Sequence, residues 1–206
     1  RYLPGRHGFT VAALGGGDGS VRIRVRALVK RRTGNNLDVN VFVGPGLGFN
    51  AASAPGESQL QASLARFSTI FGQADISVGD VSYFNVTDTR FRVIDSTDGP
   101  GSELAQLFQQ SAGRDGLALN IFLVQDIDGD GGGSTLGIAG GIPGPPGVHG
   151  SGHSGIVVAW SVLGGGSSIP GQVFAHETGH FLGLFPLHIC RCRRPYPSSS
   201  LRHAQQ

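Results

Sequence analysis

The pattern of apolar and polar residues changes along the chain and predicts strands that alternate with helices. Between residues 21 and 29, apolar residues alternate with arginines, which is the period of a strand with one solvated face. Residues 39–43 have the pattern of a buried strand, and a Gly-Pro-Gly turn ends it. Leucine and phenylalanine recur at helical spacing over residues 57–71, which predicts an amphipathic helix lying on the sheet.

The later part of the chain continues this alternation. Further strands are expected over residues 76–86, 90–94, 117–124, 135–141 and 155–160. Ser102 is placed to cap a second helix, and Pro170 is placed to begin a final helix that runs to about Leu182. This order of strands and helices predicts an α/β or α+β domain.

Composition and charge reduce the number of functions that the chain could have. The 206 residues include 35 Gly and 39% hydrophobic residues, typical of a folded domain with long, turn-rich loops. The net charge of +2 is uneven: residues 1–33 carry eight Lys/Arg and one acid, residues 34–185 carry four and thirteen, and residues 186–206 carry four and none. An acidic central domain argues against a nucleic-acid partner and suits a metal cation. No run of apolar residues is close to the length of about 18–20 residues that a membrane-spanning helix needs.

The charge distribution also suggests a division of the chain. We expect residues 1–33 to form a basic N-terminal strand segment, which is either a pro-segment or a neighbouring module. Residues 34–185 are expected to form the catalytic domain, and residues 186–206 an atypical tail.

The motif that carries chemistry is His176-Glu177-Thr178-Gly179-His180, within the predicted final helix. Four-residue spacing puts both imidazoles on one helical face, with Cβ atoms about 5–6 Å apart, which suits two ligands of one zinc ion. Glu177 lies one step round the helix, where it can take a proton from a metal-activated water as general base. The alternative is that His176 and His180 are satisfied core histidines and that Glu177 lies in solvent.

These residues resemble the metzincin zinc proteases, whose motif H-E-x-x-H-x-x-G-x-x-H also includes Gly183. The third histidine of that motif falls at Pro186, and the nearest histidine is His188. The resemblance implies a twisted mixed sheet, an active-site helix, zinc, and hydrolysis of a polypeptide substrate through a zinc-bound water. The alternative function is a catalytically impaired metzincin-like extracellular domain that lacks the third zinc ligand.

Upstream residues resemble the pappalysin-like branch of the metzincins. The resemblance rests on residues 135–139, on Ile142-Pro143 and on residues 155–158, and it covers about residues 37–185. It implies a secreted or cell-surface endopeptidase, although no secretion signal stands in this chain. It also implies that four residues form an edge strand that pairs with extended substrate: Leu136, Gly137, Ile138 and Ala139.

The tail departs from the family pattern. Metzincins carry a Met-containing turn after the third histidine, whereas this chain has no Met, and no Gly follows Gly183. We hypothesise that the sequence leaves its family after Phe185, through a frameshift, an alternative exon or a truncated gene model.

Three further features are candidates for chemistry. Asp126, Asp128 and Asp130 begin like an EF-hand loop but lack the closing Glu, so they form either a Ca²⁺ site or a solvated acidic loop. His149 and His153 either line the cleft, bind metal or are surface histidines. Ser151 lies between glycines without the strand and elbow of a serine hydrolase. Substrate preference and oligomeric state are not predicted by the sequence.

Overall fold

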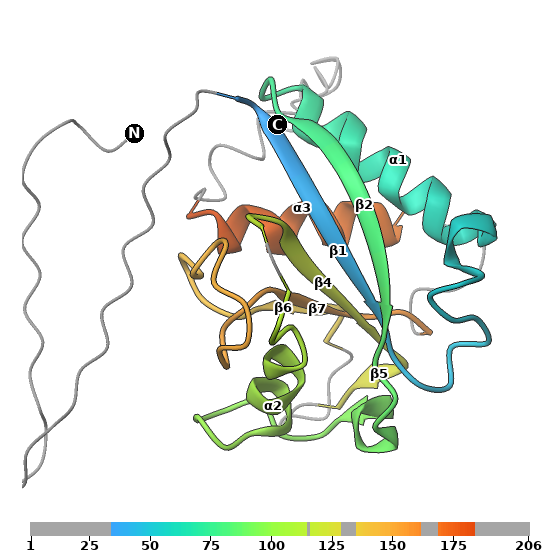
Figure 1. The fold of residues 1–206 in the computed structure, drawn as a ribbon, viewed down its shortest axis with the longest axis vertical. Coiled ribbons are helices and arrows are strands. Elements are labelled where there is room, and N and C mark those ends of the chain that lie inside the picture. The colour runs from blue at the N-terminus through green and yellow to red at the C-terminus, as the bar shows by residue number, and fades with distance from the viewer. Residues whose placement is uncertain (1–33, 115, 129–134, 162–168, 184–206) are drawn as a thin grey trace, which may run out of the picture. The chain divides into compact units, whose positions relative to one another are not determined.

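The computed structural model describes residues 34–114, 116–128, 135–161 and 169–183, which belong to one compact unit beginning at Gly34 (Figure 1). Its elements, in chain order, are β1 (Asn36–Val43), the 3-10 helix η1 (Ala54–Gly56), α1 (Ser58–Gly72), β2 (Ser77–Asn85), the 3-10 helix η2 (Thr89–Arg92), β3 (Val93–Ile94), α2 (Glu103–Gln109), β4 (Leu119–Val124), β5 (Asp126–Ile127), β6 (Gly137–Ala139), β7 (Ile156–Ala159) and α3 (Ile169–Phe181). The strand predicted over residues 21–29 and the tail from residue 186 lie outside the described residues.

The main sheet has five strands in the order β2-β1-β4-β7-β6. The first four are parallel to one another, and β6 runs antiparallel to β7, with Ile138 opposite Val157. Strand direction turns progressively from β2 to β7 (Figure 1), which is the usual twist of such sheets. The predicted α/β fold class with a twisted mixed sheet is therefore confirmed.

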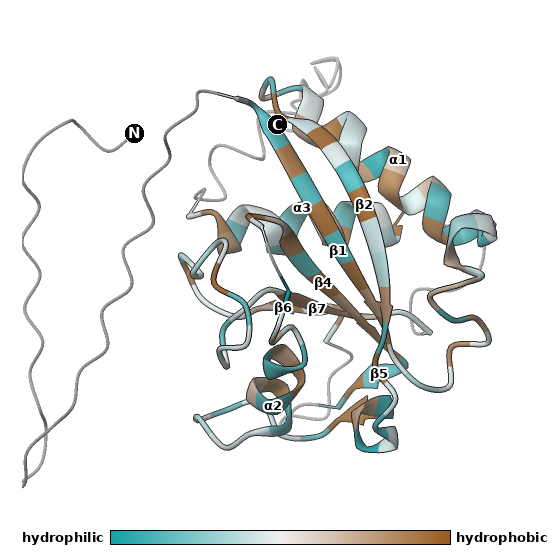
Figure 2. Cartoon of the chain, in the orientation of Figure 1, coloured by the Kyte–Doolittle hydropathy of each residue, from teal (hydrophilic) through white to brown (hydrophobic). Residues whose placement is uncertain are grey.

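Alternating residues of the strands build two apolar cores. Val39, Val41 and Val43 of β1 pack in a cluster with buried residues of α1 and α3. Phe42 points to the other face and stacks on Phe122, with ring centroids 4.4 Å apart, in a cluster with α2. The fully buried strand β7 is correspondingly hydrophobic along its length, and β4 is hydrophobic except at Asn120 (Figure 2). The sheet is thus covered by α1 and α3 on one face and by α2 on the other.

Local sequence signals account for most element boundaries. The Ser102 side chain accepts a hydrogen bond from the Ala105 N–H at 3.1 Å and caps α2, as predicted. The strand predicted over residues 90–94 is wrong in its first half, because η2 occupies Thr89–Arg92. The Asp88 side chain accepts the Arg90 N–H at 3.0 Å, which stabilises a turn instead of a strand. The short strand β5, which pairs with β3, was not predicted.

The final helix is fixed against the edge of the sheet. α3 contacts β6, β7 and α1. Gly171 permits the close crossing with α1, because a Cβ atom there would lie 2.5 Å from the Ser63 carbonyl oxygen. The candidate zinc motif is therefore held on a helix that packs against both its neighbouring helix and the antiparallel edge strand.

Candidate metal centre

The helix that carries the motif has clear start and stop signals. Pro170 is its second residue, where a missing N–H costs no helical hydrogen bond. After the helix, Gly183 adopts a left-handed conformation with φ of 73°, and its N–H donates to the His180 carbonyl oxygen at 2.9 Å. The predicted helix stop at Gly183 is confirmed, and the motif occupies the last two turns of α3.

The two histidines of the motif point toward one another. The Nε2 atoms of His176 and His180 lie 3.0 Å apart, and the two rings are nearly perpendicular, with centroids 4.5 Å apart. Two nitrogens that bind one tetrahedral zinc at Zn–N distances of about 2.0–2.1 Å are about 3.3 Å apart. The observed separation therefore fits two ligands of a single zinc ion with only a small adjustment.

Glu177 lies between these ligands in the sequence and is 9% exposed. Burial raises the pKa of its carboxyl group above the ordinary glutamate value. The charge of His180 and a hydrogen bond from the Ala139 backbone lower the same pKa but do not outweigh burial. The alternative with Glu177 in solvent is therefore wrong, because the side chain is buried against the edge strand.

A third metal ligand is not found in the part of the chain that the structure describes. Within those residues no group of three or more His, Cys, Asp or Glu side chains could hold a metal ion. The candidate third ligand, His188, lies outside them, as does Pro186. His176 and His180 are thus the two candidate metal ligands whose ring nitrogens the described residues bring together.

The edge strand predicted to bind substrate lies at the edge of the sheet. Among the described strands β6 pairs only with β7, and Leu136 precedes it with 38% of its surface exposed. The Leu136 carbonyl oxygen accepts from the Ala159 N–H, and the Gly140 N–H donates to the Gly155 carbonyl oxygen. By the alternation of antiparallel ladders, the backbone groups of Gly137 and Ala139 face away from β7.

The acidic candidates for calcium are only partly described. Asp126 lies in β5, where its Oδ1 accepts the Ile127 N–H at 2.8 Å, and Asp128 follows as an exposed residue. Asp130 lies outside the described residues. The described residues therefore include two of the three predicted calcium ligands.

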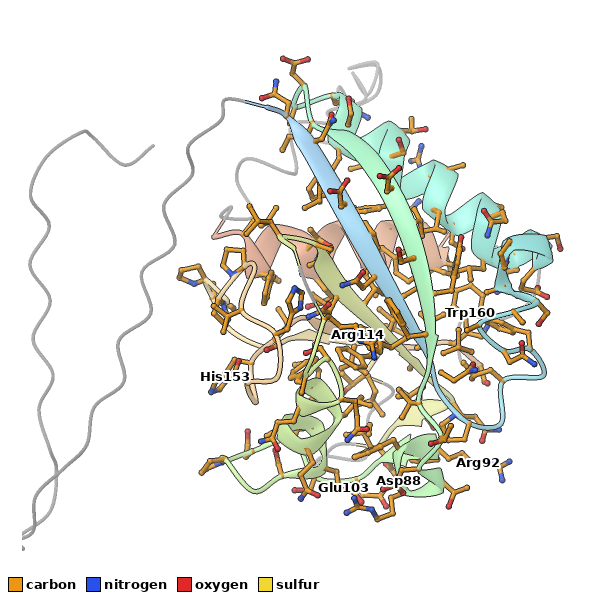
Figure 3. All side chains as sticks on the ribbon, viewed as in Figure 1. Asp88, Arg92, Glu103, Arg114, His153 and Trp160 are labelled. Carbon is orange, nitrogen blue, oxygen red and sulfur yellow. The ribbon has the colours of Figure 1, made fainter. Side chains whose placement is uncertain are left out.

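The loop before β7 contains the other predicted candidates. His153 is exposed, and its Nδ1 lies 2.6 Å from the Gly140 carbonyl oxygen (Figure 3). The Nδ1 atom of His149 lies 2.9 Å from the Asn120 Nδ2 atom, and its Nε2 lies 3.3 Å from the Gly116 carbonyl oxygen. The Ser151 hydroxyl lies 2.8 Å from the Ser154 hydroxyl, so no serine–histidine pair forms there. These residues hold the loop in place.

Two features of the structure were missed by the sequence analysis. Asn40 and Asn120 are buried polar residues at paired positions of β1 and β4, joined by a hydrogen bond of 3.0 Å. Their signal was a polar residue at an equivalent place in two otherwise apolar strands. The close contact between Gly137 and Glu177 was also missed, because no sequence pattern relates an edge-strand glycine to a residue forty positions later.

Comparisons with known proteins add a likeness in structure. No protein-family model matches the chain, and no curated protein matches it. The chain is similar to archaemetzincin from Methanopyrus kandleri, at 18% sequence identity and a TM-score of 0.48 over 76% of this chain and 78% of that one. None of the helices in the described segments has the length and apolar character needed to cross a membrane.

Proposed function

We propose that this chain is a zinc-dependent endopeptidase of the metzincin type, with His176 and His180 as metal ligands and Glu177 as general base. The observation that carries the proposal is the 3.0 Å separation of the two Nε2 atoms on one face of α3. A buried carboxylate beside them, at the edge of a sheet, supplies the remaining chemistry. Together these groups match the needs of metal-assisted hydrolysis.

The roles of the residues follow from their positions. When bound, zinc supplies a Lewis acid and lowers the pKa of a water molecule. Glu177 would take a proton from the attacking water as the water oxygen adds to the carbonyl carbon of the substrate. The same carboxyl group would then give the proton to the amine nitrogen as the carbon–nitrogen bond breaks. Burial supports this role, because a raised pKa makes the carboxylate a stronger base than an exposed glutamate.

The substrate in this proposal is a polypeptide in extended form. The outward N–H and carbonyl groups of Gly137 and the outward carbonyl group of Ala139 are placed to pair with such a chain along β6, whereas the Ala139 N–H faces Glu177. The pappalysin-like assignment, a secreted or cell-surface location and a Ca²⁺ site at Asp126, Asp128 and Asp130 belong to the proposal on sequence grounds alone.

One observation favours a second candidate function. Pro186 stands where the metzincin motif has its third histidine, and no third ligand lies among the described residues. The chain would then be a catalytically impaired domain with the same fold. Zinc content and peptidase activity distinguish the two candidates.

The experiment uses the freshly purified full chain. We expect one zinc per chain by elemental analysis, and hydrolysis of an unstructured protein such as casein. Glu177→Ala should keep the zinc and lower the hydrolysis rate by about 10²–10⁴-fold, whereas His176→Ala should lose the zinc. Asp98→Ala, an exposed acid in a loop, is the matched control and should behave as the parent. Absence of zinc, with Glu177→Ala indistinguishable from the parent, would establish the impaired domain.

A further inference from the structure

The edge strand and the motif helix approach one another unusually closely at Gly137. A Cβ atom at this position would lie 2.8 Å from the Glu177 Cγ, 2.8 Å from a Val173 methyl group and 3.1 Å from the Val157 carbonyl oxygen. The first two atoms belong to α3 and the third to the backbone of β7. No side chain fits there unless the helix, the strand or the Glu177 side chain moves.

Ala139, two residues after Gly137 in β6, is the second point of contact with Glu177. Ala139 and Gly137 lie on the same side of β6, facing away from the ladder with β7. The Ala139 backbone faces the Glu177 carboxyl group and lowers its pKa. One face of the Glu177 side chain therefore lies over Gly137, and its carboxyl group faces the backbone two residues further along the strand.

We propose that Gly137 is a positioning residue, whose missing side chain lets β6 hold the Glu177 carboxylate in place for proton transfer. This inference rests on the proposed function and deepens it. Among the described residues no Lys or Arg side chain forms an ion pair with Glu177, so the backbone of β6 is the group placed to orient it. The strand that orients the base is also the strand proposed to pair with substrate. In this proposal β6 therefore positions both the Glu177 carboxylate and the substrate backbone.

A kinetic experiment tests the positioning role. In Gly137→Ala, the new methyl group displaces the Glu177 side chain, and we expect kcat to fall at least about tenfold while zinc content stays at that of the parent. KM should change much less than kcat, because the base acts in the chemical step. Removing the Val173 methyl groups in the double variant Gly137→Ala/Val173→Ala makes room for the displaced atoms and should restore part of kcat.

The control is Gly72→Ala, at the end of α1, where an added Cβ atom meets nothing within 4 Å. It should leave kcat and KM unchanged. A Gly137→Ala variant that binds zinc and keeps kcat within about twofold of the parent would overturn the inference.

A second measurement needs neither zinc nor activity. Amide hydrogen exchange in the metal-free full chain should show the Ala139 N–H protected in the parent and at least about tenfold faster in Glu177→Ala. The Gly140 N–H, which donates to Gly155, should exchange equally slowly in both proteins. Equal protection of the Ala139 amide in both proteins would show that Glu177 does not accept its hydrogen bond, and the inference would fail.

The two experiments separate failure of the inference from failure of the proposed function. A chain without zinc or activity that still shows Glu177-dependent protection of Ala139 would refute the peptidase and leave the contact between strand and carboxylate intact. An active zinc enzyme with an unchanged Gly137→Ala kcat would retain the function and refute the positioning role.

Discussion

Burial governs the protonation of Glu177 and, with it, part of the stability of the fold. The pKa of Glu177 is higher in the folded protein than the ordinary value of 4.5, because burial disfavours the charged form. Its ionised form therefore weakens the fold above the raised pKa, and this penalty disappears as the pH falls below the unfolded-state pKa. The residue that we propose as general base is thus a residue whose burial lowers stability at neutral pH.

We therefore expect Glu177→Gln to stabilise the metal-free protein at pH 7, by roughly 1 kcal/mol in the free energy of unfolding. The gain should shrink as the pH falls toward 4.5, where the parent carboxyl group becomes protonated. Urea denaturation at several pH values measures both effects. Asp98→Asn, at an exposed site, should show neither effect, and a Glu177→Gln variant less stable than the parent at pH 7 would contradict the expectation.

At this level the sequence predicted the residues of the motif but not their surroundings. The four-residue spacing of His176 and His180 determines a shared helical face before any tertiary structure is known. The burial of Glu177 depends on β6, which is remote from α3 in sequence. The pairing of β6 in the sheet brings it into contact with α3. Contacts of that kind follow from strand order, which a local pattern does not encode.

The elements around the site are joined by a polar network on the α2 face of the sheet. The Asn120 Nδ2 atom donates to the Ser154 carbonyl oxygen at 2.7 Å and lies 2.9 Å from the His149 Nδ1 atom. Its Oδ1 accepts from the Asn40 side chain at 3.0 Å. The Ser154 carbonyl oxygen can only accept, so the Asn120 side chain must present its NH₂ group on this side. The His149 Nδ1 atom must then accept the second N–H of that group with its lone pair. One side chain of β4 thus ties β1 to the loop before β7.

We expect Asn120→Ala to lower the free energy of unfolding by about 2–3 kcal/mol, because it leaves buried Asn40 without this acceptor. Residues 148–154 should also exchange their amide hydrogens faster. The double variant Asn40→Ala/Asn120→Ala should cost less than the sum of the two single variants, since the stranded partner is removed with it. Asn36→Ala, at an exposed position of β1, is the control. A loss below about 0.5 kcal/mol in Asn120→Ala would contradict this network.

Periodicity and caps predicted the helices and long strands well, because α1, α2 and β4 each carry a strong local signal. The strand predicted over residues 90–94 is partly wrong for a local reason. The Arg90 N–H donates to the Asp88 side chain, which stabilises a turn, and is not available for a strand hydrogen bond. The two-residue strands β3 and β5 are too short to leave any periodic pattern.

For the whole molecule, the fold class followed from the order of elements, whereas the strand order did not. The position of β6 beyond β7 brings residue 137 beside residue 177, and α3 beside β6 assembles the site from separate parts of the chain. The proposed metal site likewise needs residues that lie outside α3. A catalytic zinc site has three protein ligands, and the described residues offer two candidates, His176 and His180.

His188 is the first histidine after the motif, two residues beyond the position that Pro186 occupies in the metzincin pattern. We expect His188→Ala to weaken zinc binding by the full chain at least about tenfold, because a tetrahedral site then keeps only two protein ligands. His203→Ala, which removes a histidine from the same tail, should bind zinc as the parent does. Competition with a chromophoric chelator at pH 7 measures the affinities. Equal affinities for the parent and His188→Ala would exclude His188 as the third ligand, and a stoichiometric zinc in both would require a ligand from elsewhere in the chain.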